Sequence, residues 1–207
     1  MAGGLLILGA GGHGRAVADL ARACGLTIAG FTEPGGRGGD VVGTDDDLPA
    51  LAGRLALAGA LVGVGNTALA RRAALFGRLR EHGLATPRLV HPSAAVSPSA
   101  TVGEGTVVFP HAVIGADCTI GSNVVIYSGC VVEHDCHIDD HAYLAPGAIL
   151  CGEVRVGEGA FVGAGAVAVP GTSIGKGASV DACVRVSGTL TPGMRLSLPR
   201  SIDVAPR

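Results

Sequence analysis

Aromatic residues are scarce in this chain of 207 residues, which has no Trp, two Tyr and four Phe against 35 glycines. Without large side chains the chain cannot build a conventional sandwich core, yet its apolar fraction of 48% is too high for a disordered chain. We therefore expect repetitive structure that buries small aliphatic side chains.

The chain also lacks an excess of charge and a long apolar run. Lys and Arg number 15 against 17 Asp and Glu, so no basic field exists to attract nucleic acid or an anionic membrane surface. The longest apolar stretch, residues 55–65, is half Ala and Gly and falls short of the roughly 20 residues that cross a bilayer. No basic segment precedes the first apolar run, unlike in a signal peptide. We expect a cytoplasmic protein without a membrane span.

Paired C-x-x-C spacing is absent as well. In a chain without a secretory signal, the six cysteines are expected to be free thiols that fill small buried spaces rather than disulfides. They lie at Cys24, Cys118, Cys130, Cys136, Cys151 and Cys183.

What the first third does contain is an alternation of apolar runs and helical periods. We expect strands at residues 3–8, 26–31 and 60–64, and helices at 13–24, 46–52 and 67–81. This alternation predicts a small parallel sheet with helices on both faces, an α/β Rossmann-like domain over residues 1–87.

A glycine-rich turn, GAGGHG at residues 9–14, joins the first expected strand to the first helix. It satisfies G-x-G-x-x-G, where backbone N–H groups and the helix dipole can hold a phosphate. Glu33 follows about twenty residues later, where a dinucleotide-binding domain places its ribose-binding acid. Only ~85 residues precede the next region, which favours one nucleotide over NAD. A purely structural tight turn stays open, and His13 either lines this pocket or is simply exposed.

From Leu89 the chain divides into seventeen successive hexads, the last cut short as RVSG. The second position is aliphatic except for Ala168, and the sixth is always small, as at Cys118 and Cys136. Glycine recurs at the third position, which we interpret as a tight turn that needs a small residue. This period predicts a parallel β-helix of five to six triangular coils with those two cysteines facing inward. The flat faces of such a solenoid need cover, so we expect a closed homotrimer.

These features together resemble a known family. LLILGAGGHGRAVADLA (5–21), VGVGN (62–66), LVHPSA (89–94), VEHDC (132–136) and the run 145–171 are similar to bacterial hexapeptide-repeat sugar O- and N-acetyltransferases, typified by the sialic acid O-acetyltransferase and the UDP-4-amino-sugar N-acetyltransferases. The resemblance implies a left-handed β-helix over residues 88–207, with acetyl-CoA as co-substrate and a nucleotide-linked amino sugar as acceptor. A sugar O-acetyltransferase is the alternative within the family, and a noncatalytic β-helix protein is the alternative outside it.

The hexad VVEHDC carries the candidate chemistry. His134 and Asp135 lie between two inward positions and should point outward near a corner. Acetyl transfer from a thioester needs a base near neutral pH, and an imidazole oriented by a carboxylate suits that task. The resemblance implies this role, with His134 as proton acceptor and Asp135 raising its basicity. A solvated His beside a solvated Asp is the alternative.

The remaining histidines near this hexad could form a metal site. His137 and His141, with Asp139 and Asp140 and the His134–Asp135 pair, are a candidate zinc site of the β-helical carbonic anhydrase type. We expect no metal, because the hexad positions of these histidines send them out of the coil in different directions.

The resemblance also implies binding residues. Acetyl-CoA would meet Tyr143, Gly152, Ala164 and Ala182, with Tyr143 replacing the usual histidine. The nucleotide sugar would meet the backbone of Gly11, Gly12 and His13, the acid Glu33, and Gly65. The chain departs from the family pattern at FTEP (31–34), where paired acids are usual, and at SLPRSI (197–202) near the expected CoA adenine.

Overall fold

A four-stranded parallel sheet forms the centre of the N-terminal part of the computed structural model, which describes residues 3–36 and 38–197. The strand order is β3-β2-β1-β4, from β1 (Gly4–Leu8), β2 (Ile28–Thr32), β3 (Val41–Gly43) and β4 (Leu57–Val62). The sequence does not predict β3, because this half-buried strand has three residues and follows a Gly-rich loop that hides its periodicity.

Helices cover both faces of this sheet, as predicted. On one face packs α1 (Gly12–Ala23), through Val17, Leu20 and Ala21. On the other lie α2 (Leu48–Arg54) and α3 (Leu69–Glu81), which follow the 3-10 turns η1 (Asp45–Asp47) and η2 (Asn66–Ala68). None of the helices in the described part of the chain is long and apolar enough to cross a membrane.

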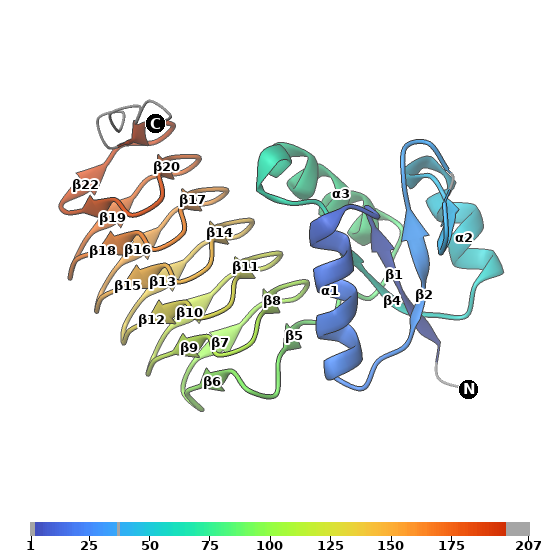
Figure 1. The fold of residues 1–207 in the computed structure, drawn as a ribbon, viewed down its shortest axis with the longest axis horizontal. Helices are drawn as coiled ribbons and strands as arrows, with labels where there is room; N and C mark the ends of the chain where they lie inside the picture. Colours follow the sequence, from blue (N-terminus) through green and yellow to red (C-terminus); the bar gives the residue numbers. More distant parts are fainter. Residues whose placement is uncertain (1–2, 37, 198–207) are drawn as a thin grey trace, which may run out of the picture.

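The predicted β-helix follows, as three parallel sheets of two-residue strands (Figure 1). The first face comprises β5 (Leu89–Val90), β8 (Val107–Val108), β11 (Val125–Ile126), β14 (Tyr143–Leu144), β17 (Phe161–Val162), β20 (Ser179–Val180) and β23 (Arg195–Leu196). The second face comprises β6 (Ala95–Val96), β9 (Val113–Ile114), β12 (Val131–Val132), β15 (Ile149–Leu150), β18 (Val167–Ala168) and β21 (Arg185–Val186). The third face comprises β7 (Thr101–Val102), β10 (Thr119–Ile120), β13 (His137–Ile138), β16 (Arg155–Val156), β19 (Ser173–Ile174) and β22 (Thr189–Leu190).

The second and sixth hexad positions fill the interior of the coil. Strands one coil apart pair in register at 18 residues, as Ile120 does with Ile138. Cys118, Cys130 and Cys136 are buried in this core as free thiols, whereas Cys183 is exposed. The prediction of burial is therefore confirmed for the sixth-position cysteines, whereas it is wrong for Cys183 and only partly met by Cys24 and Cys151, which are half-buried.

The glycines at the third hexad position have another cause than the tight turn we inferred. The left-handed conformation falls at the fifth position, as at Asp135 (φ 58°) and His141 (φ 63°). At the third position, a Cβ on Gly103 would lie 2.6 Å from the carbonyl carbon of Gly121. Glycine is needed there because the next coil approaches the backbone closely.

The coil continues beyond the last predicted hexad. Thr189 pairs with Ser173, sixteen residues earlier rather than eighteen. This shortened repeat breaks the six-residue period, which is why the sequence does not predict β22 and β23. Residues 198–202 of the divergent C-terminal segment lie outside the described part of the chain.

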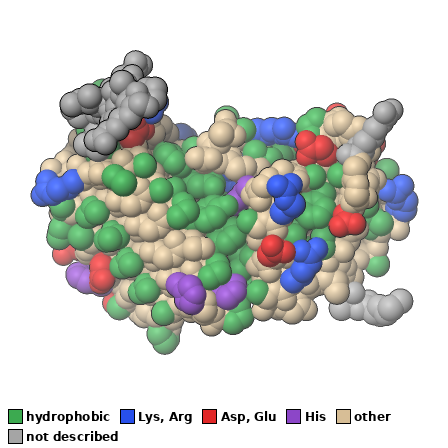
Figure 2. All heavy atoms as spheres, viewed as in Figure 1, with side chains coloured by type: hydrophobic (Ala, Val, Ile, Leu, Met, Phe, Trp, Pro, Cys, Tyr) green, Lys and Arg blue, Asp and Glu red, His purple; other side chains and the backbone are tan. Residues whose placement is uncertain are grey.

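The three faces of the β-helix differ in their cover. The first face packs against the N-terminal part, where Leu89, Val107 and Tyr143 share a core with α1. Outward side chains along the middle of the second face are apolar, namely Val113, Val131, Ile149 and Val167, and the charged Arg185 follows on the last strand of that face. Those of the third face are polar, namely Thr119, His137, Arg155 and Ser173. Hydrophobic side chains are visible over the β-helix in Figure 2. No described part of the chain covers the second face.

Candidate functional site

The glycine-rich turn places backbone N–H groups at the carboxyl end of β1. Gly11 caps α1 without a side-chain hydrogen bond, so the first turn of the helix offers its N–H groups to a ligand. A Cβ on Gly14 would overlap the carbonyl oxygen of Gly9, and Gly9 has a φ of 112°. The turn therefore requires glycine at both positions.

Glu33 closes this turn from the end of β2. Its Oε2 accepts a hydrogen bond from the backbone N–H of Ala10 at 3.0 Å. One carboxylate oxygen is thus used to hold the loop, and the other is available to a ligand. The ribose-binding role inferred for Glu33 stays a prediction.

A hollow of about 420 Å³ lies beside this turn, and all five residues predicted to bind the nucleotide sugar line it. They are Gly11, Gly12, His13, Glu33 and Gly65. The sequence did not point to four other lining residues, Asn66, Thr67, Arg71 and Tyr127. Arg71 and Tyr127 bring a cation and a phenol from α3 and the β-helix, and no sequence pattern indicated that these elements meet the turn.

His13 turns its ring toward the β-helix. Its Nδ1 lies 3.0 Å from the Tyr127 hydroxyl and its Nε2 lies 3.3 Å from Nη1 of Arg72. Burial and the Arg72 charge lower the pKa of His13 to about 3, so the ring is neutral at physiological pH. His13 therefore lines the hollow, as one of our two interpretations held, and cannot act there as a cation.

His134 and Asp135 form the predicted pair at the corner that follows β12. Nδ1 of His134 lies 2.8 Å from Oδ2 of Asp135, and 58% of the His134 side chain is exposed. A carboxylate only accepts, so Nδ1 donates its proton and Nε2 keeps a free lone pair. The hydrogen bond to Asp135 raises the pKa of His134. The ring is thus an accessible base with a fixed tautomer.

Gly152 lies one coil further on, directly against this imidazole. A Cβ on Gly152 would lie 2.6 Å from both Cε1 and Nε2 of His134. The His134 ring occupies the space that any other side chain at residue 152 would need.

The other residues predicted to bind acetyl-CoA lie elsewhere on the prism. Ala164 and Ala182 are on successive coils at the edge that follows the first face, where the N–H of Cys183 bonds to the carbonyl of Ala164 at 2.8 Å. Tyr143 is 5% exposed on the first face and lines the same hollow as His13. Its burial, and secondarily Tyr127, raise the pKa of its hydroxyl. Within one chain these residues do not meet His134.

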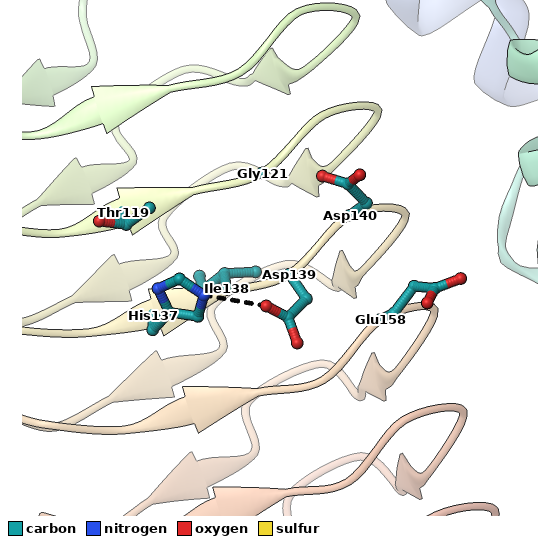
Figure 3. A pocket seen from close by; sticks show the side chains of 7 residues that line it. All are labelled: Thr119, Gly121, His137, Ile138, Asp139, Asp140 and Glu158. Carbon is teal, nitrogen blue, oxygen red and sulfur yellow. Dashed lines mark ion pairs between the residues drawn. The ribbon is translucent and has the colours of Figure 1, made fainter.

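The residues considered for a metal separate in space. His137 pairs with Asp139 at 2.9 Å on the third face, beside Asp140 and Glu158 (Figure 3). His141 instead turns toward Asn123, 3.0 Å from its Nδ1. Among residues 3–36 and 38–197, no three His, Cys, Asp or Glu side chains form a group that could hold a metal ion.

Both parts of the chain match known protein families. Residues 4–74 match the PglD N-terminal domain. Residues 99–134 and 117–152 match the bacterial transferase hexapeptide repeat, and residues 153–187 match the hexapeptide repeat of succinyl-transferase. No curated protein matches the chain.

Solved structures resemble it over nearly the whole length. PerB from Caulobacter crescentus, in complex with CoA and GDP-perosamine, is 38% identical with a TM-score of 0.89, over 94% of each chain. A variant of the GDP-perosamine N-acetyltransferase from the same organism is 37% identical with a TM-score of 0.90, over 94% of this chain and 93% of that one. The acetyltransferase domain of PglB from Neisseria gonorrhoeae, in complex with acetyl coenzyme A, is 34% identical with a TM-score of 0.86, over 92% and 94%. The coil is left-handed in these neighbours, the hand predicted for this chain.

Proposed function

The chain belongs to the family of hexapeptide-repeat sugar acetyltransferases with a PglD-type N-terminal domain, and we propose that it transfers the acetyl group of acetyl-CoA to the amino group of a nucleotide-linked amino sugar. One observation carries this proposal: the full-length likeness to an N-acetyltransferase that was solved with CoA and GDP-perosamine. The hollow at the glycine turn and the His134–Asp135 pair supply matching chemistry.

His134 acts as the base in this reaction. The neutral amine of the sugar attacks the thioester carbonyl, and Nε2 of His134 takes the proton that the nitrogen loses. The C–S bond then breaks and CoA leaves as the thiolate or, once protonated, as the thiol. Asp135 holds the ring through Nδ1 and stabilises the imidazolium form. No covalent acyl-enzyme is involved.

The two parts of the chain divide the binding work. Residues 1–87 hold the nucleotide sugar, through the backbone of Gly11, Gly12 and His13 and through Glu33 and Gly65. Residues 88–207 supply the base and bind acetyl-CoA, through Gly152, Ala164, Ala182 and Tyr143.

The active enzyme is a homotrimer. His134 follows the second face, whereas the nucleotide hollow lies on the first, so a second copy must bring the base of one chain to the hollow of another. The apolar second face supports this assembly, because Val113 and Ile149 are each more than a third exposed in the single chain. We further place the enzyme in the cytoplasm, where free cysteines stay reduced.

The product identifies the reaction. The purified protein is incubated with acetyl-CoA and a panel of nucleotide sugars, GDP-perosamine and UDP-4-amino sugars beside their 4-hydroxy counterparts, and products are resolved by mass spectrometry. We expect one acetyl group on an amino sugar and none on its hydroxy counterpart. Acetylation of the hydroxy sugar alone would establish the O-acetyltransferase instead, and no product with any member would contradict the proposal.

A mixing experiment tests the shared site. Inactive His134→Ala subunits are unfolded and refolded together with subunits inactivated in the nucleotide hollow by Gly12→Trp. If each site draws on two chains, mixed trimers regain part of the activity. Mixtures as inactive as the parents would contradict this arrangement.

A further inference from the structure

The guanidinium of Arg72 is buried where α3 meets the β-helix. Arg72 is only 1% exposed. No Asp or Glu among the described residues forms an ion pair with it. Nη1 donates to the carbonyl oxygen of Val64 at 2.7 Å, and Nη2 donates to the backbone oxygen and Oδ1 of Asn123 at 3.2 and 3.0 Å. Burying a cation without a carboxylate partner is costly, and among the described residues Nε of Arg72 has no hydrogen-bond partner either.

The contact between Arg72 and His13 decides where the proton of the His13 ring sits. A guanidinium has only donors, so Nε2 of His13 must be the acceptor in the 3.3 Å contact with Nη1. The neutral ring then carries its proton on Nδ1 and donates it to the Tyr127 hydroxyl at 3.0 Å. Because Tyr127 accepts this bond, its own hydroxyl proton is not used toward His13 and is available to another acceptor. Tyr127 lines the hollow, where phosphate and sugar oxygens would be such acceptors.

We propose that Arg72 is a positioning residue for the nucleotide sugar: it fixes His13 as the Nδ1–H tautomer, which in turn holds the Tyr127 hydroxyl as a hydrogen-bond donor toward the bound substrate. This inference rests on the proposed function. Tyr127, which lines the hollow from the β-helix, would thus depend for its orientation on Arg72 of α3.

A double-mutant cycle separates this relay from simple domain docking. Arg72→Met, Tyr127→Phe and the double variant are compared by KM for the nucleotide amino sugar that the wild type acetylates, GDP-perosamine or a UDP-4-amino sugar. Each single change is expected to raise this KM about tenfold, and the double change no further, because both break the same relay. The KM for acetyl-CoA is expected to stay unchanged. A KM for the nucleotide sugar that rises about a hundredfold in the double variant would overturn the proposal, because the two changes would then act independently.

Arg80 offers a matched control on the same helix. It also reaches the β-helix, with Nε 3.5 Å from Oε1 of Glu104, and it does not line the hollow. Arg80→Gln is expected to leave the KM for the nucleotide sugar unchanged. A loss equal to that of Arg72→Met would assign the effect to docking of the two parts and overturn the relay.

The tautomer itself is measurable without any enzymatic activity. Side-chain ¹⁵N NMR of the wild type, with the His13 signal assigned by its absence in His13→Asn, is expected to show a neutral ring protonated on Nδ1 from pH 5 to pH 8. A ring protonated on Nε2 would overturn the proposal even if the variants fail to fold. If the protein acetylates no sugar, the proposed function fails and this measurement still decides the tautomer.

Discussion

Replacing Gly152 with alanine should displace the catalytic ring without harming the fold. The new Cβ would lie 2.6 Å from Cε1 and Nε2 of His134, so the imidazole must retreat by close to an ångström to reach ordinary contact. Gly152 does not adopt a left-handed φ, so its backbone accepts a side chain. A misplacement of about 1 Å at the reacting groups costs about 100-fold in rate. We therefore expect kcat to fall about 100-fold in Gly152→Ala.

The assay must separate this displacement from lost stability and lost cofactor binding. His134 lies on the surface, where a displaced side chain costs little stability, so we expect Tm to change by only about 1–2 °C. A matched control is Gly77→Ala in α3, where a Cβ meets nothing within 4 Å and kcat should be unchanged. The reasoning is refuted if Gly152→Ala keeps its kcat, or if the whole loss appears as a higher KM for acetyl-CoA.

Three further predictions follow from the same geometry. His134 works as a base when it is neutral, and the hydrogen bond to Asp135 raises its pKa above the ordinary 6.5. Asp135→Asn should therefore move the acidic limb of the kcat/KM profile to lower pH and lower the plateau about 10- to 100-fold. An acidic limb that stays in place would contradict this. Ellman's reagent should modify exposed Cys183 quickly in the native protein, while Cys136, whose burial raises its pKa to about 12, should react only after unfolding; fast native labelling of Cys136 would refute the inward placement. Ile149→Lys places an unpaired charge on the apolar second face and should dissociate the trimer, as measured by light scattering after size exclusion; an intact trimer would exclude this face from the interface.

Periodic features of the fold could be predicted from the sequence because they depend on local repetition. The hexad period from Leu89 gave the β-helix, and Cys118 and Cys136 face inward because they hold its sixth position. The same period also limited the prediction. The repeat before Thr189 is two residues short, so the last two strands do not fit the hexad pattern and were not predicted.

The candidate site was predictable only where a motif marks it. The glycine turn and the His134–Asp135 hexad can be recognised from consecutive residues in the sequence. Arg72 and Tyr127 could not be found in this way, because their roles come from packing of α3 and the turn against the first face. Sequence spacing does not tell which of three similar faces a neighbouring domain will cover.

The most direct test of the account is thiol release from acetyl-CoA in the presence of the nucleotide amino sugar, comparing the wild type with His134→Ala and His137→Ala. His137 is the matched control, since it is also an exposed histidine paired with an aspartate, at 2.9 Å, but on the third face. We predict that His134→Ala loses orders of magnitude in kcat while still binding CoA, and that His137→Ala keeps wild-type activity. Equal rates for the wild type and His134→Ala would contradict the assignment of His134 as the base.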